Sequence, residues 1–228
     1  MGFFTNASVT SISIGNNVTW HNNSMFNAFY GCSNLNQPIT IPNTITNLKQ
    51  TFQSCSKLNQ PITIPNSVTD MMMTFRSCLM FNQPVTIPNS VTTMYMTFES
   101  CYNYNQTTII PNKVTDIMYA FNYCTNLNKN VYVGTNVYSM NYAFRYCHNL
   151  RNIIIYSNIV NKAGNMLQGR NNSKRINIWV KSSSSTTFNT LTNTQTGNSV
   201  TGNATTWTSG TNCRYNSTYN IYIYYNLA

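Results

Sequence analysis

The sequence predicts a solenoid in which short 23-residue units stack on one another, and two periodic features support this. A cysteine recurs once in every unit, and a phenylalanine stands three positions before each one. The cysteines of this series are Cys32, Cys55, Cys78, Cys101, Cys124 and Cys147. Since one unit of this size cannot bury its apolar side alone, the period predicts a stack of coils that share a continuous core.

One half of each unit has the spacing of a helix. A Met, Leu or Ile stands four positions before the phenylalanine, and an apolar or aromatic residue stands three positions after the cysteine, as in Met71, Phe75, Cys78 and Phe81. Apolar steps of four, three and three place side chains on one helical face. We therefore expect one short helical turn per unit, with the Met, Phe and Cys columns facing inward.

The other half of each unit alternates like a strand. Ile62, Thr63 and Ile64 have a period of two, and the following Pro65 and Asn66 are typical of a turn. The predicted fold is therefore an α/β-type solenoid with one short parallel strand and one short helical turn per 23-residue unit. The outward column of its sheet would be Thr40, Thr63, Thr86, Ile109, Tyr132 and Ile155.

The repeat unit resembles a known family. The segments ITIPNSVTDMMMTFRSCLMFNQP (62–84) and VTIPNSVTTMYMTFESCYNYNQT (85–107) are similar to the BspA-like leucine-rich repeat, and the resemblance extends from residue 12 to about 167. It implies a right-handed solenoid with a parallel sheet. It also implies a surface protein of a bacterium, a protozoan or a phage that binds a host or a matrix. The family implies no catalytic residues.

The period ends before the chain does. Leu167 stands in the phenylalanine column and Arg170 where a cysteine would fall. We therefore expect a leucine-rich repeat solenoid over residues 1–170, with an atypical N-terminal cap over 1–30 and repeats to about 167. Residues 171–228 contain two strand-like segments, 175–181 and 219–225, and would form a small β-rich C-terminal module.

Charge is sparse and unevenly distributed. Charged residues make up 7% of the chain, the net charge is +10, and the acids are Asp70, Glu99 and Asp116. Residues 1–116 carry four basic and three acidic side chains, whereas residues 117–228 carry nine basic ones and no acid. This half favours an anionic partner, or it is the basic remainder of a polar protein poor in acids. The apolar runs of the chain are too short to span a membrane.

The residues needed for catalysis or metal binding are not found in a suitable pattern. Zinc sites commonly use C-x-x-C pairs, but here no two cysteines lie closer than one full repeat, so buried free thiols are expected. Cys147 precedes His148, but neighbours on a helical turn point in different directions. Asp70 and Asp116 stand two units apart in one column. We therefore expect no enzyme activity, no metal and no cofactor.

The predicted function is attachment to a surface. Tyr119, Tyr123, Tyr142 and Tyr146 gather in the basic half, where they are expected to meet cationic side chains. The candidate binding residues are Ile109, Tyr132, Ile155, Arg145, Arg151 and Lys162.

Two identities fit such a protein. The first is a structural or receptor-binding component of a phage particle, such as a tail fibre, tip or head appendage. It is favoured by the Asn-, Thr- and Tyr-rich composition and by a start, residues 1–10, without a secretory signal pattern. The alternative is a fragment of a bacterial or protozoan cell-surface adhesin. Expected partners are virion proteins or a host-surface glycan or protein, and a second copy of the chain is a further candidate. Nucleic acid is not expected as a partner. The expected location is the virion or an extracellular surface.

Overall fold

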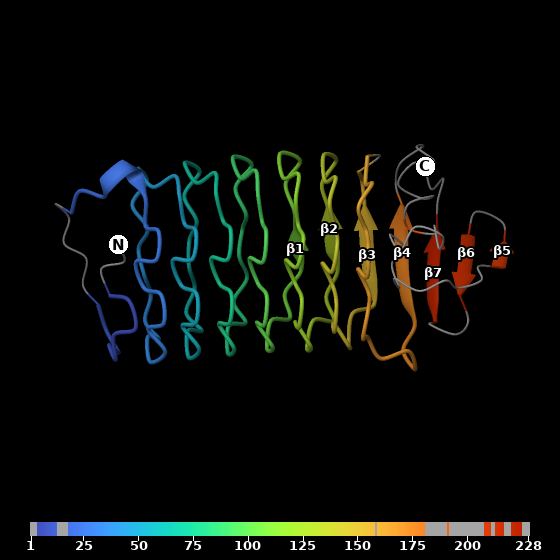
Figure 1. Cartoon of the computed structure of the whole chain (residues 1–228), viewed down its shortest axis with the longest axis horizontal. Helices are drawn as coiled ribbons and strands as arrows, with labels where there is room; N and C mark the ends of the chain where they lie inside the picture. The colour runs from blue at the N-terminus through green and yellow to red at the C-terminus, as the bar shows by residue number, and fades with distance from the viewer. Residues whose placement is uncertain are drawn as a thin grey trace.

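The computed structural model of the chain is an elongated stack of coils (Figure 1). It describes residues 4–12, 18–157, 159–180, 191, 208–210, 213–216 and 220–224. The ribbon changes from blue at one end through green to orange and red at the other, so successive coils follow the order of the sequence. This arrangement is the solenoid that the 23-residue period predicts.

One sheet runs along the C-terminal half of the stack. Its parallel strands are β1 (Thr108–Ile109), β2 (Val131–Val133), β3 (Asn152–Ile155), β4 (Ile176–Val180) and β7 (Ile221–Tyr224). Strands β6 (Cys213–Asn216) and β5 (Thr208–Gly210) continue it in antiparallel pairing, in the order β1-β2-β3-β4-β7-β6-β5. The strands expected within 175–181 and 219–225 are β4 and β7. A short 3-10 helix, η1, spans His21–Asn23.

The predicted strand is missing from the first three complete units, because prolines flank it. Ile62 and Ile64 are buried and Thr63 is exposed, as the alternation predicts, but the segment forms no strand. Pro61 and Pro65 bracket it, and proline has no N–H to donate to a ladder. In the unit of β1 only the proline that follows the strand is present, and no proline is adjacent to β2. The strands accordingly lengthen from two residues in β1 to five in β4.

The predicted helical turn is wrong, because these residues form a row of tight turns. From Met71 to Cys78, every second backbone N–H donates within the coil, as from Cys78 to the Phe75 carbonyl (3.0 Å). The others donate to the next coil, as from Phe75 to the Thr97 carbonyl (2.9 Å). An α-helix would keep these donors for itself. Met73 and Ser77 have φ of 54° and 60°, the left-handed conformation that type II turns require at their third position.

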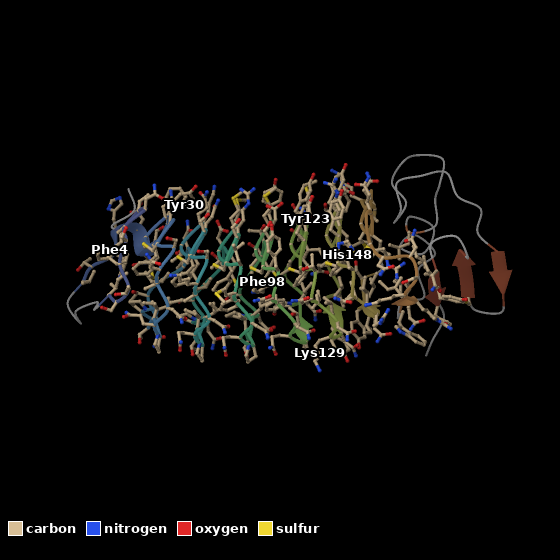
Figure 2. All side chains as sticks on the ribbon, turned by 90° about the horizontal axis from the view of Figure 1, so that it is seen from below. Phe4, Tyr30, Phe98, Tyr123, Lys129 and His148 are labelled. Carbon is tan, nitrogen blue, oxygen red and sulfur yellow. The ribbon has the colours of Figure 1, made fainter. Side chains whose placement is uncertain are left out.

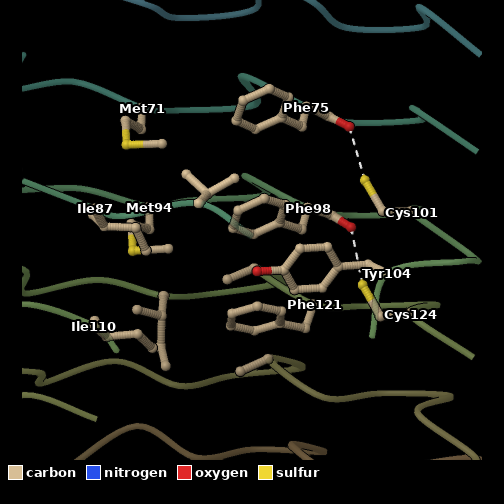
Figure 3. Packing of buried hydrophobic residues seen from close by; sticks show 14 of the residues in the cluster. Met71, Phe75, Ile87, Met94, Phe98, Cys101, Tyr104, Ile110, Phe121 and Cys124 are labelled. Atoms are coloured by element: carbon tan, nitrogen blue, oxygen red, sulfur yellow. Dashed lines mark hydrogen bonds between the residues drawn. The ribbon is translucent and has the colours of Figure 1, made fainter. Parts of the chain in front are cut away.

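A ladder of phenylalanines fills the centre of the stack. Rings from Phe29 to Phe144 stack on their neighbours with centroids 5.3 to 5.7 Å apart. The repeat cysteines lie beside them as buried free thiols, as predicted. Figure 3 shows the Cys101 and Cys124 thiols donating to the carbonyls of Phe75 and Phe98, at 3.0 and 3.1 Å. Cysteine suits this column because it is small and apolar yet supplies one weak donor.

Burial predicts which thiols react. Burial raises the pKa of the Cys78 and Cys124 thiols well above the ordinary value. Cys213 is only partly buried, and burial raises the pKa of its thiol less strongly. Since the thiolate is the reactive form, iodoacetamide should modify at most Cys213 in the native protein, faster as pH rises, and the six repeat cysteines only after unfolding. Mass spectrometry of the labelled protein measures this. Fast native labelling of several repeat cysteines would contradict the core described above.

Candidate functional site

The solenoid has two long faces that present different side chains. The strand face carries β1–β4 and β7, and the turn face carries the row of tight turns. In Figure 2, Tyr123 of the turn face and Lys129, which precedes β2, lie on opposite sides of the stack with Phe98 between them. A ligand that covers one face therefore cannot contact the other.

The strand face carries a stripe of large side chains. The strand register places Ile109, Tyr132, Ile154, Trp179 and Tyr224 side by side on β1, β2, β3, β4 and β7. We call these five residues the aromatic stripe. Ile109 is 67% exposed, Tyr132, Trp179 and Tyr224 are partly exposed, and the rings of Trp179 and Tyr224 stack at 4.3 Å. The same column carries threonine in the earlier units, so the face becomes apolar only in the C-terminal half.

Ile155 was expected in this stripe, but it faces the core. It is fully buried and pairs with Val133, while Ile154 pairs with Tyr132. In the strand register, Val131 lies four residues after Leu127, whereas its partner Ile153 lies only three residues after Leu150. A shift of one residue moves every strand side chain to the opposite face. The outward position in β3 therefore belongs to Ile154.

Basic side chains flank the stripe where β3 and β4 begin. The guanidinium of Arg175 lies 3.8 Å from the centroid of the Tyr222 ring, and it also donates to Asn177 Oδ1 (2.8 Å) and the Tyr224 hydroxyl. Arg151, a predicted site residue, donates to the Arg175 carbonyl (3.5 Å) and so lies beside this group. The Arg175 side chain could not be assigned to a surface from the repeat pattern, because its position follows the end of the period.

The turn face holds a second group, the tyrosine cluster of Tyr119, Tyr123, Tyr142, Arg145 and Tyr146. Tyr119 stacks on Tyr142 at 4.7 Å and Tyr123 on Tyr146 at 4.4 Å. The Arg145 guanidinium lies 5.6 and 4.8 Å from the ring centroids of Tyr142 and Tyr146. These tyrosines were expected to gather and to meet a cationic side chain, and they do.

The four tyrosines of this cluster have φ between 56° and 62°. Met73, Ser77, Met96 and Ser100 have the same conformation at the same repeat positions, so the positive φ belongs to the tight turns and does not distinguish the tyrosine cluster.

The structure thus distributes the six predicted site residues over separate regions. Ile109, Tyr132 and Arg151 lie at the strand face, Arg145 belongs to the turn face, and Ile155 is in the core. Lys162 lies near Tyr138, with its Nζ 5.5 Å from the ring centroid, in a column of single β-bridges that begins at Ser24. No single surface unites the six.

The described residues show no arrangement suited to catalysis. Asp70 and Asp116 each accept the backbone N–H two residues further on at 2.8 Å, and Glu99 pairs with Arg76 at 2.7 Å. The buried thiol of Cys147 donates to the Phe121 carbonyl. Within the described ranges, no three His, Cys, Asp or Glu side chains gather where they would hold a metal ion. None of the helices in those ranges has the length and hydropathy of a membrane span.

Comparisons with known proteins agree with this architecture. A family model described as BspA type leucine rich repeat region matches residues 95–221, and one described as Mycoplasma protein of unknown function, DUF285, matches residues 2–111. No curated protein shows significant similarity to the chain.

Two solved structures share the fold. A leucine-rich repeat protein of T. pallidum is 25% identical with a TM-score of 0.50, and the match covers 57% of this chain and 60% of that one. A leucine-rich repeat protein of Bacteroides ovatus is 26% identical with a TM-score of 0.51, over 68% and 42% of the two chains. The chain therefore spans less than two thirds of either protein's length.

The register shift at β3 predicts unequal costs of two isoleucine substitutions. Ile155→Ala should lower the free energy of unfolding by about 2–5 kcal/mol because it leaves a cavity in the core. Ile109→Ala should change it by no more than about 0.5 kcal/mol, since that side chain is largely exposed. Urea denaturation of both variants measures the difference. Equal small effects would mean that Ile155 points outward and that the shift is absent.

Proposed function

Because the chain belongs to the BspA-type leucine-rich repeat family, we propose that it is a non-enzymatic attachment protein that binds a macromolecule through its strand face. The observation that carries this proposal is the aromatic stripe. Five strands present Ile, Tyr, Ile, Trp and Tyr in one register; Ile109 is 67% exposed and three aromatic side chains are partly exposed, while Ile154 between them is 9% exposed. Exposed apolar surface of this kind marks interaction sites.

The chemistry of the stripe fits a protein or a glycan partner. Tyr, Trp and Arg are the side chains that contribute most often to binding energy at interfaces, and all three occur in or beside the stripe. The hydrogen-bonded sheet holds them in place before binding, so little side-chain entropy remains to be lost. Arg151 and Arg175 would add electrostatic attraction at one end, while the apolar stripe supplies most of the affinity.

Two locations were expected for such a protein, a cell surface and a phage particle. We favour the cell-surface adhesin, because both similar solved structures are bacterial leucine-rich repeat proteins. The phage hypothesis rests on features of the sequence, chiefly the low-charge, Asn-, Thr- and Tyr-rich composition. Detection of the protein on intact cells by surface labelling would support the adhesin, and detection in purified virions would support the phage component.

A double substitution tests the stripe. We expect Ile109→Ser with Tyr132→Ser to weaken binding to an array of immobilised matrix proteins and host-cell glycans by about tenfold or more, equivalent to about 1.4 kcal/mol. The matched control, Thr40→Ser with Thr63→Ser, lies in the same column and should bind like the wild type. Surface plasmon resonance on the array positives provides the affinities.

Four outcomes would contradict the proposal. In the first, the wild type binds no component of the array, and in the second, the stripe variant binds as tightly as the wild type. In the third, sedimentation shows self-association that the stripe variant loses, which would make the stripe an interface between copies of the chain. In the fourth, a high salt concentration abolishes wild-type binding while the stripe variant still binds at low salt, which would mean that the arginines rather than the stripe capture the ligand.

A further inference from the structure

A groove lined by asparagine amides runs along the edge of the solenoid where the chain passes from the turn face toward the strands. Its volume is about 450 Å³, and seven of its eight lining residues are asparagines. The inner row consists of Asn59, Asn82, Asn105 and Asn128, which occupy one repeat position in four successive coils. Asn105 and Asn128 each stand three residues before a strand.

Hydrogen bonds fix the orientation of the inner amides. The Oδ1 atom of Asn82 accepts the backbone N–H of Asn105 at 2.8 Å, and Oδ1 of Asn105 accepts that of Asn128 at 2.8 Å. Because the donor is a backbone N–H, the accepting atom must be the amide oxygen. In Asn59, Asn82 and Asn105, whose Oδ1 atoms accept in this way, the Nδ2 group is thereby directed away from the ladder. Among the described residues, no acceptor pairs with the Nδ2 groups of Asn105 and Asn128.

The outer row offers both donors and acceptors. Asn126 Nδ2 donates to Asn103 Oδ1 at 3.2 Å, which leaves Asn126 Oδ1 and Asn103 Nδ2 unused by that bond, and both residues line the groove. Asn149 closes the row, and its Oδ1 accepts the Lys174 ammonium at 2.5 Å. The groove thus presents oriented N–H donors on one side and a mixture of donors and carbonyl acceptors on the other.

Apart from the Lys174 ammonium that reaches Asn149 at one end, the groove is neutral, and its rim is apolar. Its eight lining residues are uncharged, and Met80 is 51% exposed at its border. Tyr102, next to Asn103, is 43% exposed. Anionic ligands gain no ion pair from the lining residues. Hydroxyl groups both donate and accept, so a polyhydroxylated ligand matches these amides, while the apolar faces of its rings suit Met80 and Tyr102.

The spacing of the rows favours an extended polymer. Amides in successive coils repeat about every 4.8 Å, the distance between neighbouring strands. An extended peptide advances about 3.3 Å per residue and falls out of step with this repeat. A chain of pyranose rings advances by a length close to one rung. We propose that the groove binds a neutral, extended glycan that lies along the solenoid axis with about one sugar per coil. This site is separate from the aromatic stripe.

Asparagine-to-aspartate substitutions test the groove with little change of shape. Asn105→Asp keeps the oxygen that accepts the Asn128 backbone N–H, and together with Asn128→Asp it removes two Nδ2 donors from the groove. The matched control is Asn36→Asp, because Asn36 accepts the backbone N–H of Asn59 in the same ladder (2.9 Å) but does not line the groove. Isothermal titration uses four neutral probes, the hexasaccharides of chitin, cellulose, mannan and starch, and sulfated heparin hexasaccharide as the anionic comparison.

We expect the wild type to bind at least one neutral hexasaccharide, and its trisaccharide more weakly because fewer coils are spanned. The double variant should lose about tenfold or more in affinity, whereas Asn36→Asp should bind like the wild type. The Ile109→Ser, Tyr132→Ser variant should also bind the hexasaccharide normally, which separates this site from the proposed attachment surface. The proposal is overturned if no neutral hexasaccharide binds, if Asn36→Asp weakens binding equally, or if only heparin binds.

Discussion

The whole molecule depends on the hydrogen bonds that join each coil to the next. Along the turns every second N–H donates to the following coil, and each repeat thiol donates to a phenylalanine carbonyl one coil back. These bonds keep equivalent positions of successive repeats one rung apart. A column in the sequence therefore becomes a row on the surface, and each face acquires the character of its column.

The three surface features follow from this constraint. The aromatic stripe, the tyrosine cluster and the asparagine groove are each built from residues at the same repeat positions in successive coils. Where the register changes by one residue at β3, Ile154 takes the outward position instead of Ile155 and is covered there to 9% exposure. The function of such a protein is thus sensitive to single insertions, which alter the surface while leaving the core columns filled.

The repeat length, the inward columns and the buried thiols could be predicted because one fixed period constrains every unit at once. The tight turns could not, since steps of four and three fit both a helix and successive turns. Among the residues that the structure describes, glycine marks the left-handed positions only at Gly31 and Gly169, and Met, Ser or Tyr occupies most others. The absence of strands in the early units could have been predicted from prolines such as Pro61 and Pro65. The groove depends on amide orientations that no pattern reveals.

The most direct test of the stacked-coil account is the cost of removing one ring from the middle of the ladder. Phe98 is fully buried, and it stacks on Phe75 and Phe121 at 5.5 Å and on Tyr104 at 4.5 Å. The account predicts that Phe98→Ala lowers the free energy of unfolding, measured by urea denaturation, by about 3–5 kcal/mol. A loss below about 1 kcal/mol would show that this column does not hold the coils together.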